Sequence, residues 1–254
     1  MTIRFSTGVR NGLAQGLGFA GLFNDGCISI YSGSQPSTAD TAPTGTLLGT
    51  ISISSGAITK ETQASGTITL TGGSTSVTAV TVGTFNIIPD GAVLYDTSTT
   101  ITATALAAAI NRNGIYSATS SGAVVTIKPR PGVGAAHNGY VVSSTGSVTA
   151  TYGNMASGVT AVNGLKLSDV VVGVVSKPAS AVWSFAGVAA GTAGWFRFQG
   201  SVTDAGATIS AAPWLARMDG SVAVSGGDMA LSNIAITEYS PNTVDSFSFT
   251  VPAA

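Results

Sequence analysis

The chain has 254 residues, of which only 8% are charged, and its formal net charge is −1. With 44% hydrophobic residues it is too apolar to be disordered, so we expect it to be folded throughout. His137 is its one histidine and Cys27 its one cysteine, which leaves few side chains for acid, base, nucleophile or metal-ligand roles. This composition disfavours an enzyme and predicts no cofactor and no metal.

The low charge also bears on partners. Weakly charged surfaces repel one another little, so we expect a homo-oligomer, with a trimer as the first expectation. The basic residues form no cluster beyond Lys128 and Arg130, which predicts neither nucleic acid nor a membrane surface as partner. The glycine-broken start predicts no secretory leader, and no apolar run is long enough for a spanning helix. We therefore expect a protein made in a cytoplasm whose partners are proteins.

Residues 6–23 are predicted to form the first helix, since Ser6 or Thr7 can cap its start and apolar side chains recur on one face. The apolar positions are Val9, Leu13, Leu17 and Ala20. Glycines at every fourth position, Gly8, Gly12 and Gly16, either form a smooth stripe that lets another backbone approach or simply mark loops.

This first segment has two interpretations. It is either an arm that docks onto a neighbouring subunit or a helix packed on its own sheet. The candidate interface residues are Phe5, Leu13, Leu17, Phe23 and Trp214.

After this segment the period changes to two, which predicts a strand near residues 27–31. A loop rich in Pro and Thr, residues 36–43, leads to a second strand at 46–53.

Residues 63–160 have denser Thr and Ser, almost no Trp and their own strand spacing, which indicates a separate domain. Ser98 or Thr99 can cap a helix that runs to Asn111 and stops before Asn113. The predicted strands are 66–71, 77–82, 84–88, 116–119, 123–128, 140–144 and 148–152. One helix on an antiparallel sheet makes this a small α+β domain.

From about residue 165 short apolar runs alternate with turn residues, as in a β-sandwich. The predicted strands are 170–175, 181–185, 194–199, 208–210, 215–218, 229–231, 234–237 and 246–251. The predicted fold class is therefore mainly β. Residues 1–62 and 161–254 are predicted to form a discontinuous antiparallel β-sandwich with a short N-terminal helix, which binds the partner. An α+β domain inserted at 63–160 is predicted to interrupt it and project outward.

Five stretches of the outer segments resemble a known family. They are residues 4–8 (RFSTG), 28–36 (ISIYSGSQP), 44–48 (TGTLL), 191–198 (GTAGWFRF) and 219–229 (DGSVAVSGGDM). They resemble small virion-associated proteins from the structural gene clusters of tailed bacteriophages. The resemblance covers roughly 1–60 and 160–254, and residues 63–160 depart from the family pattern as an insertion. It implies a virion structural protein.

No residue pattern predicts a chemical site. A solitary His137 in a glycine-rich loop is interpreted as an exposed polar residue, since a base needs an orienting partner and a metal several ligands. The aspartates mostly lie at turns, where they bond nearby amides, and Asp228 after two glycines lacks the other ligands that calcium needs. The run Gly16 to Gly21 matches a dinucleotide fingerprint only by coincidence, because no strand precedes it.

The leading hypothesis is a non-enzymatic capsid decoration protein that binds the major capsid protein of the shell. Alternatives are a tail, neck or baseplate component, which would bind other virion proteins, and a carbohydrate- or host-surface-binding module. For the last, Trp214 beside a proline is the candidate exposed ring.

Overall fold

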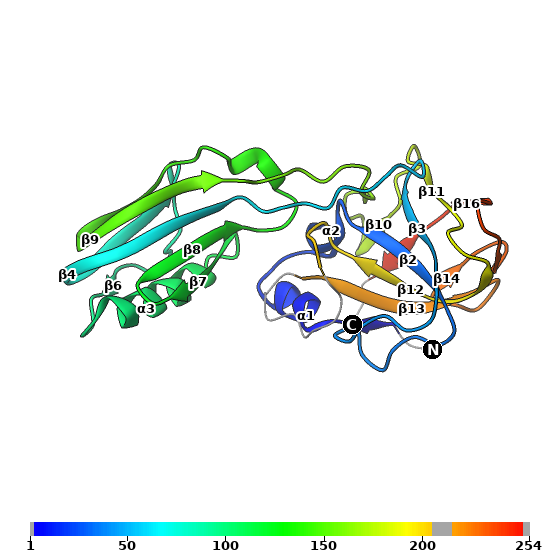
Figure 1. Cartoon of the computed structure of the whole chain (residues 1–254), viewed down its shortest axis with the longest axis horizontal. Coiled ribbons are helices and arrows are strands. Elements are labelled where there is room, and N and C mark those ends of the chain that lie inside the picture. The colour runs from blue at the N-terminus through cyan, green and yellow to red at the C-terminus, as the bar shows by residue number, and fades with distance from the viewer. Residues whose placement is uncertain (1–2, 205–214, 251–254) are drawn as a thin grey trace. The chain divides into compact units, whose positions relative to one another are not determined.

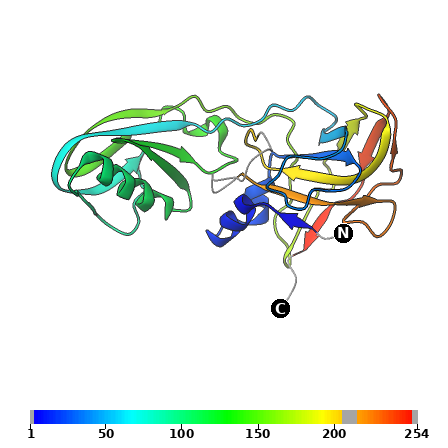
Figure 2. The same ribbon diagram turned by 60° about the horizontal axis from the view of Figure 1, so that its bottom comes forward.

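The computed structural model describes residues 3–204 and 215–250. The chain divides into two compact units, unit 1 with residues 1–61 and 161–254 and unit 2 with residues 62–160 (Figures 1 and 2). The predicted class is confirmed, since both units are built mainly from antiparallel strands with few helices.

Unit 1 is organised around one large sheet. Its strands run in the order β1 (Arg4–Phe5), β13 (Arg217–Ala223), β12 (Gly191–Gln199), β2 (Cys27–Ser32), β3 (Leu47–Ile53), β11 (Trp183–Ala186) and β16 (Pro241–Val244). Two short strands join it, β14 (Met229–Ala230) on β13 and β15 (Ala235–Ile236) on β12. A separate pair is formed by β10 (Val174–Ser176) and β17 (Ser248–Thr250), and the helices are α1 (Thr7–Ala14) and α2 (Phe19–Phe23).

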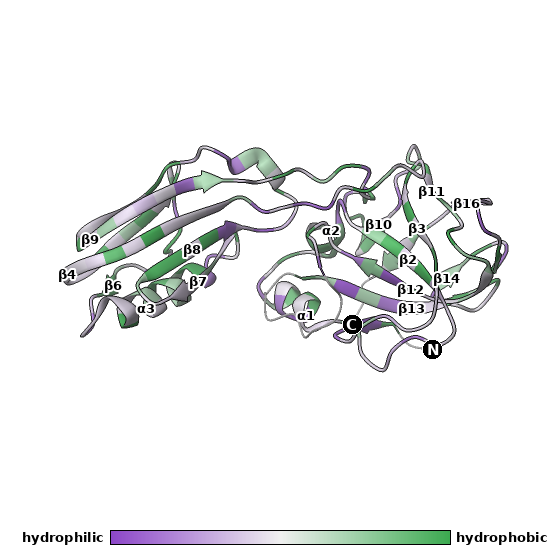
Figure 3. Ribbon diagram, viewed as in Figure 1, coloured by the Kyte–Doolittle hydropathy of each residue, from purple (hydrophilic) through white to green (hydrophobic). Residues whose placement is uncertain are grey.

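One face of this sheet forms the core of unit 1. Met218, Phe198, Ile28 and Ile51 are paired across four neighbouring strands and therefore lie in one row on the same face. All four are buried. Figure 3 shows apolar residues on β2 and β12, with hydrophilic positions interrupting β12 and β13.

Helix α2 and the β10–β17 pair pack against this apolar row. The ring of Phe23 lies 4.7 Å from that of Phe198, and Phe249 of β17 stacks on Phe19 at 4.1 Å. Burial of aromatic rings of this size stabilises the core strongly.

The predicted helix at 6–23 is two helices. Ser6 caps α1 by accepting a hydrogen bond from the backbone N–H of Val9, as predicted. The close approach of another backbone is found at Gly8, where a Cβ would lie 2.1 Å from a backbone carbonyl oxygen. At Gly12 the close neighbour is a side chain, since a Cβ there would lie 2.6 Å from a leucine methyl of α2. Gly16 has a φ of +85° and open space around it, so there the loop interpretation is right, and the chain breaks between the helices.

Unit 2 contains a six-stranded sheet and one long helix. Its strands are β4 (Ser65–Val82), β5 (Phe85–Asn86), β6 (Val93–Leu94), β7 (Tyr116–Ser121), β8 (Val124–Pro129) and β9 (Val142–Ala156). Helix α3 (Thr99–Asn111) has the predicted position, with Ser98 accepting from the N–H of Ile101. A 3₁₀ helix, η1 (Gly134–His137), lies in the segment that was predicted to be an exposed loop.

Two predicted pairs of short strands are single long ones. The segments 66–71 and 77–82 join as β4, and 140–144 and 148–152 join as β9. The ribbon formed by β4 and β9 folds back on itself, so that the two ends of β9 lie side by side. The backbone N–H of Met155, near the end of β9, donates to the carbonyl of Tyr140, just before its start, at 2.9 Å. Register shifts around Gly72 and Val77 accompany this bend, as bulges do.

Several later strands differ in extent from the prediction. Strand β10 begins four residues later than expected, because a tight turn from Val171 to Val174 precedes it. The strand predicted at 215–218 continues to Ala223. The strand predicted at 208–210 lies outside the described residues. Strands β1, β6 and β16 were not predicted, since two to four residues carry too little periodicity.

Candidate functional site

The predicted interface residues lie in different environments. Phe23 and Leu17 are buried in the core of unit 1, so assigning them to an interface is wrong: the helices pack on their own sheet. Phe5 is partly buried and meets Phe249 edge to face at 5.9 Å. Leu13 is 42% exposed and can contact a partner. Trp214 lies outside the described residues.

The face of the large sheet opposite the core carries a row of polar residues. Pairing across five strands aligns Arg4, Asp219, Arg197, Ser29 and Thr50. Alternation along each strand puts them on the other side from the Phe198 row. A charged row at the centre of a sheet needs partners and a cover, because unpaired buried charge is costly.

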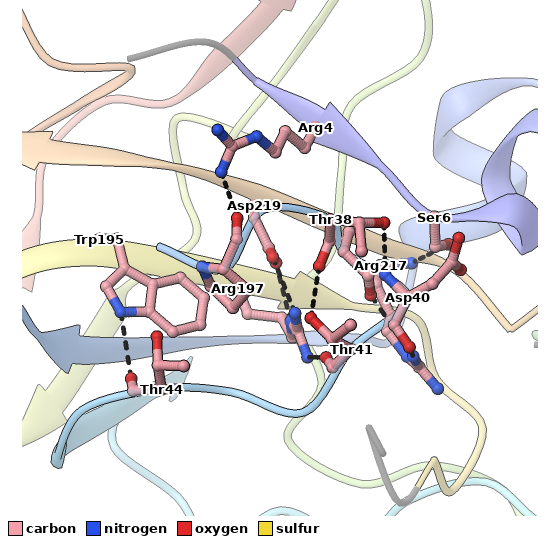
Figure 4. Close-up of polar contacts among 12 residues, drawn as sticks. Arg4, Ser6, Thr38, Asp40, Thr41, Thr44, Trp195, Arg197, Arg217 and Asp219 are labelled. Atoms are coloured by element: carbon pink, nitrogen blue, oxygen red, sulfur yellow. Dashed lines mark hydrogen bonds and ion pairs between the residues drawn. The ribbon is translucent and has the colours of Figure 1, made fainter. Parts of the chain in front are cut away.

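Arg197 and Asp219 form a two-pronged ion pair at the centre of this row (Figure 4). The Nε–Oδ1 and Nη2–Oδ2 distances are both 2.7 Å, and neither residue is exposed. The remaining Nη1 of Arg197 donates to the backbone carbonyl of Thr41 at 2.8 Å. The pair thus also holds the loop that covers it.

A second buried ion pair, between Arg217 of β13 and Asp204, has the same two-pronged arrangement. Arg217 donates through Nε and Nη2 to the carboxylate of Asp204 at 2.5 and 2.6 Å. Its Nη1 reaches the carbonyl oxygens of Ala39 and Asp40 at 3.4 and 3.3 Å. We call Arg197–Asp219 and Arg217–Asp204 together the arginine clamp.

The clamp fixes the β2–β3 loop, residues 33–46. Besides the contacts of the two clamp arginines, the guanidinium of Arg4 donates to the carbonyl of Pro36, and Trp195 Nε1 donates to that of Thr44 at 3.2 Å. The Asp40 carboxylate accepts from the N–H and hydroxyl of Thr7 at 2.9 and 2.8 Å, which ties the loop to the start of α1. Figure 4 shows the bonds of Trp195, Arg197 and Arg217 reaching this loop from strands of the sheet.

Trp195 contacts two further side chains of this face of the sheet. Tyr31 stacks on its ring at 4.5 Å, and the guanidinium carbon of Arg197 lies 5.6 Å from the ring centroid. Burial raises the pKa of Tyr31, so its hydroxyl is neutral at physiological pH.

The clamp holds neighbouring groups in place. Its arginines stay charged, and both carboxylate oxygens of each aspartate accept hydrogen bonds from its arginine. Such bidentate pairs fix geometry. Among the residues that the structure describes, no three His, Cys, Asp or Glu side chains are grouped to hold a metal. Asp228 accepts from the N–H and hydroxyl of Ser221 at 2.8 and 2.7 Å, which is the turn role expected for it.

A second candidate site lies in unit 2, around His137. The imidazole is partly buried, with Nδ1 3.1 Å from the hydroxyl of Tyr116 and the ring stacked on Tyr140 at 4.7 Å. Burial lowers the pKa of His137 and raises the pKa of Tyr116, so both groups are neutral near pH 7. The interpretation of His137 as a solitary exposed residue is wrong, because two tyrosines flank it.

Neither the clamp nor this cluster was predicted. The clamp joins residues far apart in the chain, and its one local signal is Arg197 between Phe196 and Phe198, a cation in a strand of core aromatics. The cluster around His137 has a local signal in the sequence, because Tyr140 follows His137 by three residues.

No protein-family model, no curated protein and no solved structure matches this chain. Within the described ranges, no helix is long and apolar enough to cross a membrane.

Proposed function

We propose that the chain is a non-enzymatic structural protein of a tailed-bacteriophage virion, most specifically a decoration protein that binds the assembled capsid as a homo-oligomer. One observation carries this proposal. The stretches that resemble virion-associated proteins are scattered over the sequence, yet their strands β1, β13, β12, β2 and β3 are successive neighbours in one sheet.

These stretches also supply the clamp's central pair and both ends of the loop that covers it. Arg4, Arg197 and Asp219 come from three of them, and the bonded carbonyls of Pro36 and Thr44 from two more. A chance similarity of short segments gives no reason for them to meet in one buried network. Their convergence favours a resemblance between folded modules, which is the level at which a shared role is expected.

The surface of unit 1 offers a second support. The tip before β10 exposes Val170, Val171 and Val172, the last 94% exposed with a φ of +48°. A branched side chain in that backbone region is strained, and strain persists at sites where surrounding structure imposes it. An exposed apolar tip fits contact with another protein.

In this proposal unit 1 binds the shell through such contacts, which leaves unit 2 available to other partners. Each contact can be weak, since a symmetric oligomer on a symmetric lattice adds them by avidity. The small net charge of the chain is compatible with dense packing on a lattice.

The deciding experiment is quantitative mass spectrometry of purified particles of the phage that encodes the chain. A copy number near that of the major capsid protein supports decoration. A small ring-like number moves the chain to the neck, tail or baseplate, and absence from particles refutes the virion proposal.

The valine tip gives a sharper test of the binding surface. Val172→Asp is expected to abolish co-sedimentation of the purified chain with undecorated shells, because a charge cannot be buried in an apolar contact. Val224→Asp is the matched control, since Val224 is 58% exposed and follows β13 instead. Equal binding by the two variants would remove the tip from the interface.

A further inference from the structure

We propose that the pocket formed by Phe85, Tyr116, His137 and Tyr140 in unit 2 binds a neutral sugar ring. The pocket has a volume of about 460 Å³ and is open to solvent. The other lining residues are Val82, Gly83, Thr84 and Ile115. This inference is independent of where on a particle the chain lies.

The walls of the pocket are aromatic and partly exposed. Phe85 is 46% and Tyr140 43% exposed. Tyr140 lies nearly parallel to His137, with an interplanar angle of 18°. Partly exposed aromatic rings at a pocket suit the apolar C–H groups of a pyranose.

The rings are held in place before any ligand arrives. Tyr116 is 2% exposed, and its hydroxyl bonds to His137. Gly83, with a φ of +61°, turns the chain between β4 and β5, and a Cβ there would sit 3.4 Å from the Tyr140 ring. Fixed groups lose little conformational entropy on binding, which favours affinity for a small ligand.

The polar atoms of the pocket match hydroxyl groups. Because His137 and Tyr116 are neutral, the tyrosine hydroxyl can donate to Nδ1, and the imidazole proton then lies on Nε2. Within the described part of the chain, neither this Nε2 nor the Tyr140 hydroxyl has a hydrogen-bond partner. A sugar hydroxyl can accept from the first and pair with the second in either direction.

The same features disfavour other ligands. The lining contains no Asp, Glu, Lys or Arg, so nothing balances the charge of a phosphate or an acidic sugar. An apolar side chain from a protein would cover His137 Nε2 and leave this donor unpaired, which is unfavourable. A neutral hydroxylated ring satisfies both the walls and the polar atoms.

His137 provides the assay, because it is the one histidine of the chain and its imidazole C–H signals need no assignment by mutation. The full chain is titrated with methyl glucoside, methyl galactoside and N-acetylglucosamine while these signals are followed by NMR. We expect a saturable shift with at least one sugar, with a Kd of about 1 mM or below, and saturation transfer to that sugar's ring protons.

Two variants locate the binding. Tyr140→Ala is expected to weaken it at least about tenfold, equivalent to about 1.4 kcal/mol. Tyr152→Ala removes another exposed tyrosine of unit 2, 41% exposed and outside the pocket, and should leave the Kd unchanged. If the alanine variant does not fold, Tyr140→Phe replaces it as the test. This variant keeps the aromatic ring and should lose only the part of the sugar affinity that the hydroxyl contributes. No response to any of the three sugars overturns the proposal, as does binding that survives Tyr140→Ala in a folded protein.

Discussion

Arg197→Met tests how strongly the stability of unit 1 depends on the buried ion pair between Arg197 and Asp219. The change removes one partner of an ion pair in which neither side chain is exposed, and it leaves the carboxylate of Asp219 buried. Breaking such a pair costs about 3–5 kcal/mol. The carbonyl of Thr41 also loses its donor, but Thr41 is exposed and water can replace that donor, so the expected cost comes from the buried carboxylate.

The double variant Arg197→Met, Asp219→Leu separates the pair from the burial of charge. It leaves no unpaired charge, and apolar replacements of buried pairs are often neutral or stabilising. The carbonyl of Thr41 loses its donor in this variant too, but Thr41 is exposed, so water can replace that donor. The double variant should therefore be more stable than Arg197→Met alone and far less destabilised than the sum of the two single variants.

Urea unfolding followed by tryptophan fluorescence measures this effect in unit 1, because all three tryptophans fall in its residue ranges. Lys166→Met is the control, since its pair with Asp25 is largely exposed on the lysine side and should contribute at most about 1 kcal/mol. A cost below about 1 kcal/mol for Arg197→Met, or additive single variants, would refute the reasoning.

Four further substitutions and one titration test local features. Gly8→Ala should destabilise unit 1 by about 1–3 kcal/mol because its Cβ meets a carbonyl oxygen, whereas Gly21→Ala in α2 has free space and should stabilise by up to about 1 kcal/mol in the same urea assay. Val172→Gly should raise stability by about 1 kcal/mol by relieving the left-handed backbone, and an unchanged urea midpoint would contradict the strain. The pKa of His137 should lie below about 6.5 by NMR titration. Between that pKa and about 6.5 the unfolded chain binds more protons, so unit 2 should lose stability as pH falls through this window and stay constant above it. Tyr116→Phe should shift the pKa of His137 upward, because the lost hydrogen bond favours the neutral ring.

Local features were predictable from the sequence because they depend on neighbouring residues. Ser98 and Ser6 cap their helices as expected, since a cap needs only its own hydroxyl and an amide three residues on. The change of period at Gly26 located β2 for the same reason.

The clamp was not predictable because strand order decides it. Arg197 and Asp219 are 22 residues apart, and nothing between them shows that β12 and β13 pair in this register. The interface prediction failed for Phe23 for a related reason. A glycine-rich helix looks weak alone, but Gly8 lets α1 approach the backbone of Leu215 and Gly12 lets it approach Leu22 of α2, so both helices pack within unit 1.

The clamp uses a large part of the chain's few charges, since four of the 21 charged residues are buried in its two pairs. There they cannot aid solubility, and apolar residues could fill the same space. What apolar residues cannot do is hold the carbonyls of the β2–β3 loop, because those need donors. We therefore expect the clamp to serve the conformation of this loop more than the stability of the fold.

This expectation leads to a prediction that stability data alone cannot make. If the β2–β3 loop contacts the shell, the variant Arg197→Met, Asp219→Leu should remain folded and yet be incorporated into particles at a reduced level. Lys166→Met, which leaves the loop contacts intact, should be incorporated normally. The measurement is the copy number of each variant in purified particles, compared at equal expression and after its urea midpoint is known. Normal incorporation of the double variant would mean that the clamp shapes a loop the shell does not touch, and that docking depends on the valine tip or another surface.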